Sequence, residues 1–486
     1  MAQKYTLTDK LVKVLIPLCI LCIGVLLATL AYYAERWEGG GDNIWHYYYS
    51  KYAYIYPKFF LHHWGKPFFI FLSAPFSQFG FFALQLFNII CGLLSAYIAY
   101  KWCKKLNFAY SFSAFLIAIF SPMYFASLQT ALTEPLFSLL LIYSAYLMFC
   151  EKYFWATLIA STLIYSRSEG LFILVIYAVY LLISKKFKYI PLLAFAFLIY
   201  SIIGALSGHN FFWYFTENPY NEVSPYGKGT WLHFISSYEF IYGLPYVILF
   251  ACGTLVFLIK IISSKNYLFW QHIGPHFKIF CLVFVPFVLF FVFHVYAWAE
   301  GKYASAGEWR VMACIMPLGA VICLYALSLI SQVKFVWIHR IAVLVILFFV
   351  VKAAFIYEYP SKATVDFQLE KEAAKWFKTV REPGTKIYYA HSAIIFYADW
   401  DPFDKDNKEC FGFPNSNCVP YNGNQKFYYV WDSAFCESAC GNKLSDIEAC
   451  PNLVKIKEFE KDNFKIVFFE SKSPFDKCFG TSEEIK

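Results

Sequence analysis

Long apolar segments recur along the first three quarters of the chain. A helix that crosses the hydrocarbon core of a bilayer needs about 20 apolar residues, and segments on that scale predict about eleven transmembrane helices in residues 1–357. Two short segments meet at Arg167-Ser168-Glu169. The expected spans are 11–33, 80–100, 109–127, 131–150, 153–166, 169–184, 189–207, 240–261, 279–298, 309–331 and 337–357. This is the pattern of a polytopic α-helical membrane protein.

Residues 358–486 have a different pattern. Apolar positions between Asp366 and Val380 recur at helical spacing, and Pro383-Gly384 follows. Strand-like runs come next, at Lys386–Ala390, Lys426–Trp431 and Phe464–Glu470. One helix followed by strands predicts a small C-terminal domain of the α/β or α+β class.

Composition agrees with a membrane protein, because the chain is 59% hydrophobic and only 15% charged. Lys and Arg number 24 in residues 1–357, against 12 Asp and Glu. With the N-terminus in the cytoplasm, 15 of those 24 cations fall on the cytoplasmic side, as the positive-inside rule requires. The basic excess therefore indicates topology and lipid contact, and no nucleic-acid partner is predicted.

An odd number of spans places the C-terminal domain outside the cytoplasm. Six cysteines support this placement, because an even set confined to one small domain suggests up to three disulfides in an oxidising compartment. They are Cys410, Cys418, Cys436, Cys440, Cys450 and Cys478.

The acidic residues of the membrane part gather on the predicted outer side, where ten of the twelve fall. The long outer loops 34–66 and 208–239 could cover a cavity there. Glu134, Arg167 and Glu169 lie at the margins of apolar runs, and charges in such places usually face a cavity. A solvated face is the plain alternative, and Glu134 before Pro135 could simply cap a helix.

The order of several motifs resembles that of the GT-C superfamily of membrane glycosyltransferases, and in particular the bacterial relatives of protein O-mannosyltransferases and of the aminoarabinose transferase. The matching stretches cover roughly residues 1–357. They are Gly41-Asp42 with His46, Leu132-Thr133-Glu134-Pro135-Leu136-Phe137, Ser166-Arg167-Ser168-Glu169-Gly170, Glu308-Trp309-Arg310 and Met316-Pro317-Leu318. Many relatives have a paired Asp-Glu in the first loop, whereas Asn43 follows Asp42 here, so Glu38 is the candidate for a second carboxylate.

This resemblance implies transfer of a sugar from a polyprenyl-phosphate carrier to a glycan, lipid or protein acceptor at the periplasmic face of the bacterial inner membrane. Asp42 is then the catalytic base. The expected substrate-binding residues include cations for the carrier phosphate, because guanidinium groups match phosphate oxygens, and acids that shape the sugar site. The full set is Glu38, His46, Glu134, Arg167, Glu169, Lys302, Glu308 and Arg310.

Each of these residues also has a structural interpretation. Asp42 could be an ordinary loop acid, Arg167 could bridge Glu134 or Glu169, and Arg310 could pair with Glu308. His46 could serve only in packing. No compact set of metal ligands is visible, so no metal site or required cofactor is predicted, although the resemblance allows a divalent metal.

Two other classes of protein stay open. No nucleotide-binding motif is present, which favours a lipid-linked donor over a nucleotide sugar. A transporter or lipid flippase would carry charges throughout the membrane depth and a hydropathy repeat, and neither is seen. A non-catalytic membrane scaffold with a partner-binding periplasmic domain is the second alternative.

Overall fold

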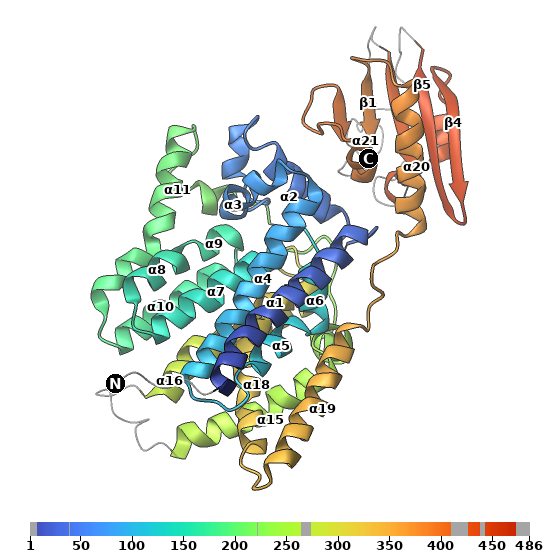
Figure 1. Cartoon of the computed structure of the whole chain (residues 1–486). Coiled ribbons are helices and arrows are strands. Elements are labelled where there is room, and N and C mark those ends of the chain that lie inside the picture. The colour runs from blue at the N-terminus through green and yellow to red at the C-terminus, as the bar shows by residue number, and fades with distance from the viewer. Residues whose placement is uncertain are drawn as a thin grey trace. The chain divides into compact units, whose positions relative to one another are not determined.

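The computed structural model describes residues 7–37, 39–220, 222–263, 274–409, 426–437 and 443–472. The chain forms two compact units (Figure 1). The first, the helical unit, comprises Met1–Gly39 and Tyr49–Ser361, and the second, the sheet unit, comprises Gly40–Tyr48 and Lys362–Lys486. Helix α2 (Gly41–Lys51) therefore begins in the sheet unit and ends in the helical one.

The helical unit is built from helices and short helical turns. They are α1 (Leu7–Tyr33), η1 (Pro57–Leu61), α3 (Pro67–Ser77), α4 (Phe81–Lys105), α5 (Ser113–Ile119), α6 (Pro122–Ser127), α7 (Glu134–Phe149), α8 (Tyr153–Ser161), α9 (Leu163–Ser166), α10 (Gly170–Ile183), η2 (Phe187–Ala194), α11 (Phe195–Leu206), α12 (Trp213–Thr216), α13 (His233–Ser236), α14 (Tyr238–Ile241), α15 (Leu244–Ser263), α16 (Pro275–Ile279), η3 (Phe280–Phe284), α17 (Val285–Ala299), η4 (Trp309–Ile315), α18 (Met316–Ile330) and α19 (Val336–Ala354).

Seven of the described helical segments are long and apolar enough to cross a membrane, and three shorter apolar helices accompany them. A mostly helical membrane fold with a small C-terminal sheet domain is thus confirmed, while the expected count of about eleven spans is not. Proline explains part of the difference. The expected span 109–127 is broken between α5 and α6, where Pro122 begins the second helix.

Burial separates central helices from peripheral ones. In the segment formed by η4 and α18, 89% of the residues in its 18-residue apolar window are buried, and α18 packs against α4, α5 and α15. By contrast, only 17% of the residues in the corresponding window of α1 and 11% in that of α19 are buried, and both helices expose large apolar side chains. Such surfaces suit contact with lipid, because a bilayer imposes no cost on exposed apolar groups.

The sheet unit contains a five-stranded sheet in the order β2-β1-β3-β5-β4. Its strands are β1 (Lys386–Tyr389), β2 (Asn407–Glu409), β3 (Phe427–Asp432), β4 (Leu453–Lys461) and β5 (Phe464–Ser471), and its helical elements after Lys362 are α20 (Val365–Val380), α21 (Ser392–Ala398), η5 (Ser433–Glu437) and α22 (Leu444–Glu448). Strand β1 is parallel to β2 and β3, whereas β5 is antiparallel to β3 and β4. The predicted helix and the three predicted strands are all present.

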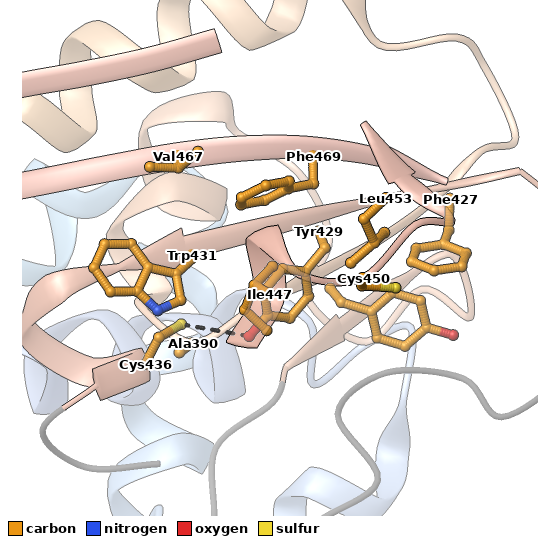
Figure 2. Packing of buried hydrophobic residues seen from close by; sticks show 11 residues of the cluster. Ala390, Phe427, Tyr429, Trp431, Cys436, Ile447, Cys450, Leu453, Val467 and Phe469 are labelled. Carbon is orange, nitrogen blue, oxygen red and sulfur yellow. Dashed lines mark hydrogen bonds between the residues drawn. The ribbon is translucent and has the colours of Figure 1, made fainter. Parts of the chain in front are cut away.

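Two hydrophobic layers hold this sheet. Helix α20 places Trp376 and Phe377 against β5, with ring centroids 5.0 and 4.9 Å from that of Phe468. A second cluster, which includes Tyr429, Trp431 and Phe469, is shown in Figure 2. Aromatic rings occur in both layers, and such large side chains help a small sheet to obtain a sufficient core.

The predicted framework of three disulfides is not supported, because Cys436, one of its six members, is a free cysteine. Cys436 carries a buried thiol in the cluster of Figure 2, where its Sγ lies 3.9 Å from the Tyr429 hydroxyl. Cys450 is disulfide-bonded, but its partner is not among the described residues. The other four predicted members, Cys410, Cys418, Cys440 and Cys478, also lie outside the described residues.

Candidate active site

A tight connection between α9 and α10 places Arg167 and Glu169. A Cβ atom on Gly170 would lie 2.4 Å from the backbone carbon of Leu163, so only glycine allows the start of α10 to approach α9 this closely. The Arg167 amide donates to the Leu163 carbonyl at 2.9 Å. This compact turn directs both charged side chains toward the N-terminal end of α7.

Arg167 joins two carboxylates. Its Nη1 lies 2.8 Å from Glu134 Oε1, and its Nη2 lies 2.8 Å from Glu169 Oε1. Arg310, from η4, reaches the same Glu134 oxygen, with its Nε at 3.8 Å. Because the Glu134 side chain is only 4% exposed and that of Arg167 14%, these charges interact with little screening by solvent. We call Glu134, Arg167, Glu169 and Arg310 the charged cluster.

Burial and pairing act in opposite directions on Glu169. Burial disfavours the ionised form of this carboxyl, whereas its contact with the Arg167 guanidinium at 2.8 Å favours that form. His294, a buried residue of α17, also borders Glu169, with its Nε2 3.2 Å from Oε1. Glu169 is therefore an ionised acid held by surrounding cationic and polar groups.

Lys66 is a further buried cation beside the cluster, and the sequence analysis missed it. Its Nζ donates to Ser168 Oγ at 2.9 Å and lies 4.7 Å from the centroid of the Tyr220 ring. Burial lowers the pKa of Lys66 to about 7, although Glu169 opposes that shift. The available signal was a lysine next to Pro67 on the predicted outer side, where the positive-inside rule makes lysine less common.

The chain approaches Arg310 closely just before α2. Gly39 has a positive φ of 82°, and a Cβ atom there would lie 1.8 Å from Arg310 Nη1. Any other residue would both strain the backbone and displace the guanidinium. The glycine run that the sequence showed before Asp42 thus has a physical function, which is to let the backbone lie against a cation of the cluster.

Asp42 lies in the first turn of α2 and is half-buried, while His46, one turn later, is buried. Aromatic residues of α2 pack within the sheet unit: Tyr47 and Tyr48 lie 6.1 and 6.4 Å from Phe396 of α21, measured between ring centroids. These two tyrosines of the outer loop 34–66 therefore pack against the C-terminal domain.

Two other predicted site residues, Lys302 and Glu308, make no ion pair with the charged cluster. Lys302 is half-buried and Glu308 is exposed, and neither forms an ion pair with any described residue. The alternative pairing of Arg310 with Glu308 is thus replaced by its approach to Glu134. Glu38 is outside the described residues. Within the part of the chain that the structure describes, no group of three or more His, Cys, Asp or Glu side chains could hold a metal ion.

Comparison with known proteins gives a likeness of fold. No family model matches the sequence, and no curated protein matches it. Two solved structures of ArnT from Cupriavidus metallidurans match over almost the whole chain. The apo structure has a TM-score of 0.64 at 9% identity, covering 94% of this chain and 98% of ArnT. The structure bound to undecaprenyl phosphate has a TM-score of 0.61 at 10% identity, covering 93% and 97%. The chain therefore shares the fold of ArnT over almost its whole length.

Proposed function

We propose that the protein transfers a sugar from a polyprenyl-phosphate carrier to an acceptor at the periplasmic face of the bacterial inner membrane. The observation that carries the proposal is the charged cluster, in which buried cations and carboxylates meet at the ends of several helices. The likeness to ArnT, one of whose structures holds undecaprenyl phosphate, supports a lipid-linked phosphate as the ligand.

The leaving group accounts for the cations. When the sugar departs, the carrier changes from a phosphate diester to a monoester and gains negative charge, which fixed cations stabilise. Arg167 and Arg310 supply two fixed cations against the carboxylates of Glu134 and Glu169. Lys66, beside Ser168 and with a pKa of about 7, adds a third cation when it is protonated. The carboxylates hold the Arg167 guanidinium in one orientation, so little reorganisation is needed when the phosphate charge develops.

Asp42 is proposed as the general base. It accepts the proton of the acceptor hydroxyl as the acceptor oxygen bonds to the anomeric carbon. The bond from that carbon to the phosphate oxygen then breaks, which inverts the configuration and releases the carrier monophosphate. Asp42 follows Gly39, which lies against Arg310, by three residues in the chain.

The remaining predicted residues receive narrower roles. Glu134 and Glu169 orient the cations and the sugar, while Lys302 and Glu308 serve contacts outside the cluster. The C-terminal domain is proposed to bind the acceptor, which could be a glycan, a lipid or a protein. Its packing around residues 40–48 supports a link between acceptor binding and Asp42.

The test compares Asp42→Asn with the wild-type protein. Purified full-length protein in lipid is supplied with a polyprenyl-phosphate-sugar pool from a bacterial membrane, and sugar transfer is measured. General-base catalysis contributes about 10²–10⁴-fold, so transfer by Asp42→Asn should fall by at least about 100-fold. Glu239→Gln, which neutralises an exposed acid of loop 208–239, is the matched control and should retain transfer.

Two outcomes would contradict the proposal in different ways. Equal transfer by Asp42→Asn and wild type would remove Asp42 from the mechanism but leave the transferase function intact. No transfer by wild-type protein from any polyprenyl-phosphate sugar would favour the flippase or scaffold interpretation. Movement of labelled carrier across the bilayer, measured in the same vesicles, separates those two.

A further inference from the structure

A groove runs between α1 and α4 and shares no residue with the charged cluster. Its volume is about 740 Å³, and every lining residue comes from these two helices. Between Leu86 and Lys104 it extends for about 27 Å along α4, at 1.5 Å per residue. That length exceeds the depth of one leaflet, which is half of a hydrocarbon core of about 30 Å. The groove is therefore long enough to receive a lipid chain.

The two ends of the groove differ in chemistry. Most of the lining is aliphatic, with Ile16, Ile20 and Leu93 as examples. Lys101 and Lys104 line only one end. Neither lysine forms an ion pair with a residue that the structure describes, and residues 14–33 and 81–105 contain no Asp or Glu. The positive-inside rule predicts that this end faces the cytoplasm.

Tyrosine rings hold the two ammonium groups beside the groove. Lys101 Nζ lies 6.0 Å from the Tyr97 ring centroid, and Lys104 Nζ lies 5.9 Å from that of Tyr100. Lys104 Nζ also donates to the Tyr100 hydroxyl at 3.5 Å. Tyr97 and Tyr100 line the groove as well. Both lysines are thus placed where an anionic group at the groove's end would meet them.

We propose that this groove binds an anionic phospholipid of the cytoplasmic leaflet, with one acyl chain between α1 and α4 and the headgroup phosphate against Lys101 and Lys104. Charge complementarity selects the ligand, because an apolar channel that ends at two cations fits an anionic lipid better than a zwitterionic one. The lipid would also cover part of α1, which has little protein contact of its own. The proposal does not depend on the sugar-transfer activity.

Native mass spectrometry of the full-length protein tests this binding. The detergent-purified protein is titrated with phosphatidylglycerol, or with phosphatidylcholine carrying the same acyl chains. Each lysine near an anionic lipid strengthens binding by roughly five-fold. The Lys101→Gln/Lys104→Gln variant should therefore bind phosphatidylglycerol roughly 25-fold more weakly, whereas phosphatidylcholine binding should be unchanged.

Two further variants test whether the charge of these two lysines and the groove itself are both needed for binding. Lys185→Gln/Lys186→Gln removes the same charge from another predicted cytoplasmic segment and should bind as wild type. Val25→Trp keeps both lysines but fills the groove from α1 and should also weaken phosphatidylglycerol binding. Equal loss in the Lys185 and Lys186 variant, or no loss in the Lys101 and Lys104 variant, would overturn the proposal. Preference for an isoprenoid monophosphate over phosphatidylglycerol would overturn the assignment to a phospholipid.

Discussion

Replacing Arg167 by glutamine should destabilise the helical unit strongly. The change leaves two carboxylates without the cation that both contact at 2.8 Å. Removing one partner of a buried ion pair costs about 3–5 kcal/mol. Glu134 keeps Arg310 at 3.8 Å and Glu169 keeps His294 at 3.2 Å, so we expect the lower end of that range, about 3 kcal/mol.

A second substitution separates the structural role of Arg167 from a catalytic one. In Arg167→Gln/Glu169→Gln one cation and one anion are removed together, and Glu134 retains Arg310. The double variant should therefore recover most of the lost free energy of unfolding, to within about 1 kcal/mol of wild type. Coupling of this kind is the signature of two residues in direct contact.

Unfolding in mixed detergent micelles, followed by tryptophan fluorescence, measures the four proteins of this cycle, and sugar transfer is assayed on the same samples. If Arg167 binds the carrier phosphate, the stable double variant transfers less sugar than Glu169→Gln alone. If Arg167 is only a bridge, transfer returns with stability. Losses that simply add in the double variant would refute the reasoning, because they would mean that Arg167 and Glu169 are not coupled.

Two other predictions concern backbone approach and pH. Gly170→Ala should cost about 1–3 kcal/mol of unfolding free energy in the same micelle assay, because the new Cβ overlaps the α9 backbone. The control Gly274→Ala, where the new Cβ has open space around it, should change the free energy of unfolding by less than about 0.5 kcal/mol. Equal effects of the two substitutions would contradict the packing argument. Glu370 is buried in the sheet unit, which raises the pKa of its carboxyl well above the usual range. The protonated Glu370 carboxyl therefore makes its full contribution to the free energy of unfolding below about pH 4.3, the pKa of an unfolded glutamate. That contribution is lost at about 1.4 kcal/mol per pH unit as the pH rises toward the folded pKa. Hydrogen exchange of β1 in the full chain should show Glu370→Gln more protected than wild type at pH 8, with the difference shrinking at pH 5; greater protection of wild type at pH 8 would mean that Glu370 is ionised and stabilised.

Nearby groups explain why the pKa of the Glu370 carboxyl is raised. His391 Nδ1 is 3.7 Å from Glu370 Oε1, but this nitrogen accepts the Ala393 amide and so carries no proton. Burial lowers the pKa of His391 to about 4, so its ring is neutral at physiological pH. Asp432 and Asp366 add negative charge near Glu370. No cation therefore compensates the burial of this carboxyl among the groups that act on it.

The sequence predicted what depends on continuous runs of residues. Apolar length predicted a mostly helical membrane fold, although not its number of spans. Charges at the margins of apolar runs singled out Glu134, Arg167 and Glu169, which the structure brings together. Glu370 could also have been noticed, because it follows Phe367 by three residues and precedes Phe377 by seven, on the apolar face of α20. The sequence did not predict strand β4, because most of its side chains are exposed or half-buried and many of them are charged.

What the sequence could not supply is proximity between distant segments. Lys66 reaches Ser168 across 102 positions, and Arg310 reaches Glu134 across more than 170. The periodicity of apolar residues does not predict these long-range contacts, because they depend on how the helices pack. The division of α2 between two units is equally hidden, because its sequence reads as one short aromatic helix.

The location of the charged cluster follows from the cost of charge in a membrane. Glu134 begins α7, Arg167 and Glu169 lie between α9 and α10, and Arg310 lies in η4 before α18. All are at helix ends, where a charge costs less than the roughly 2.5–3.5 kcal/mol of a central position. Even there, a buried ion pair is often less stable than apolar residues of the same volume. Because such a cluster gives little stability for its cost, it supports the proposed role in binding a ligand, and its two arginines, with Lys66 beside them, favour an anionic ligand.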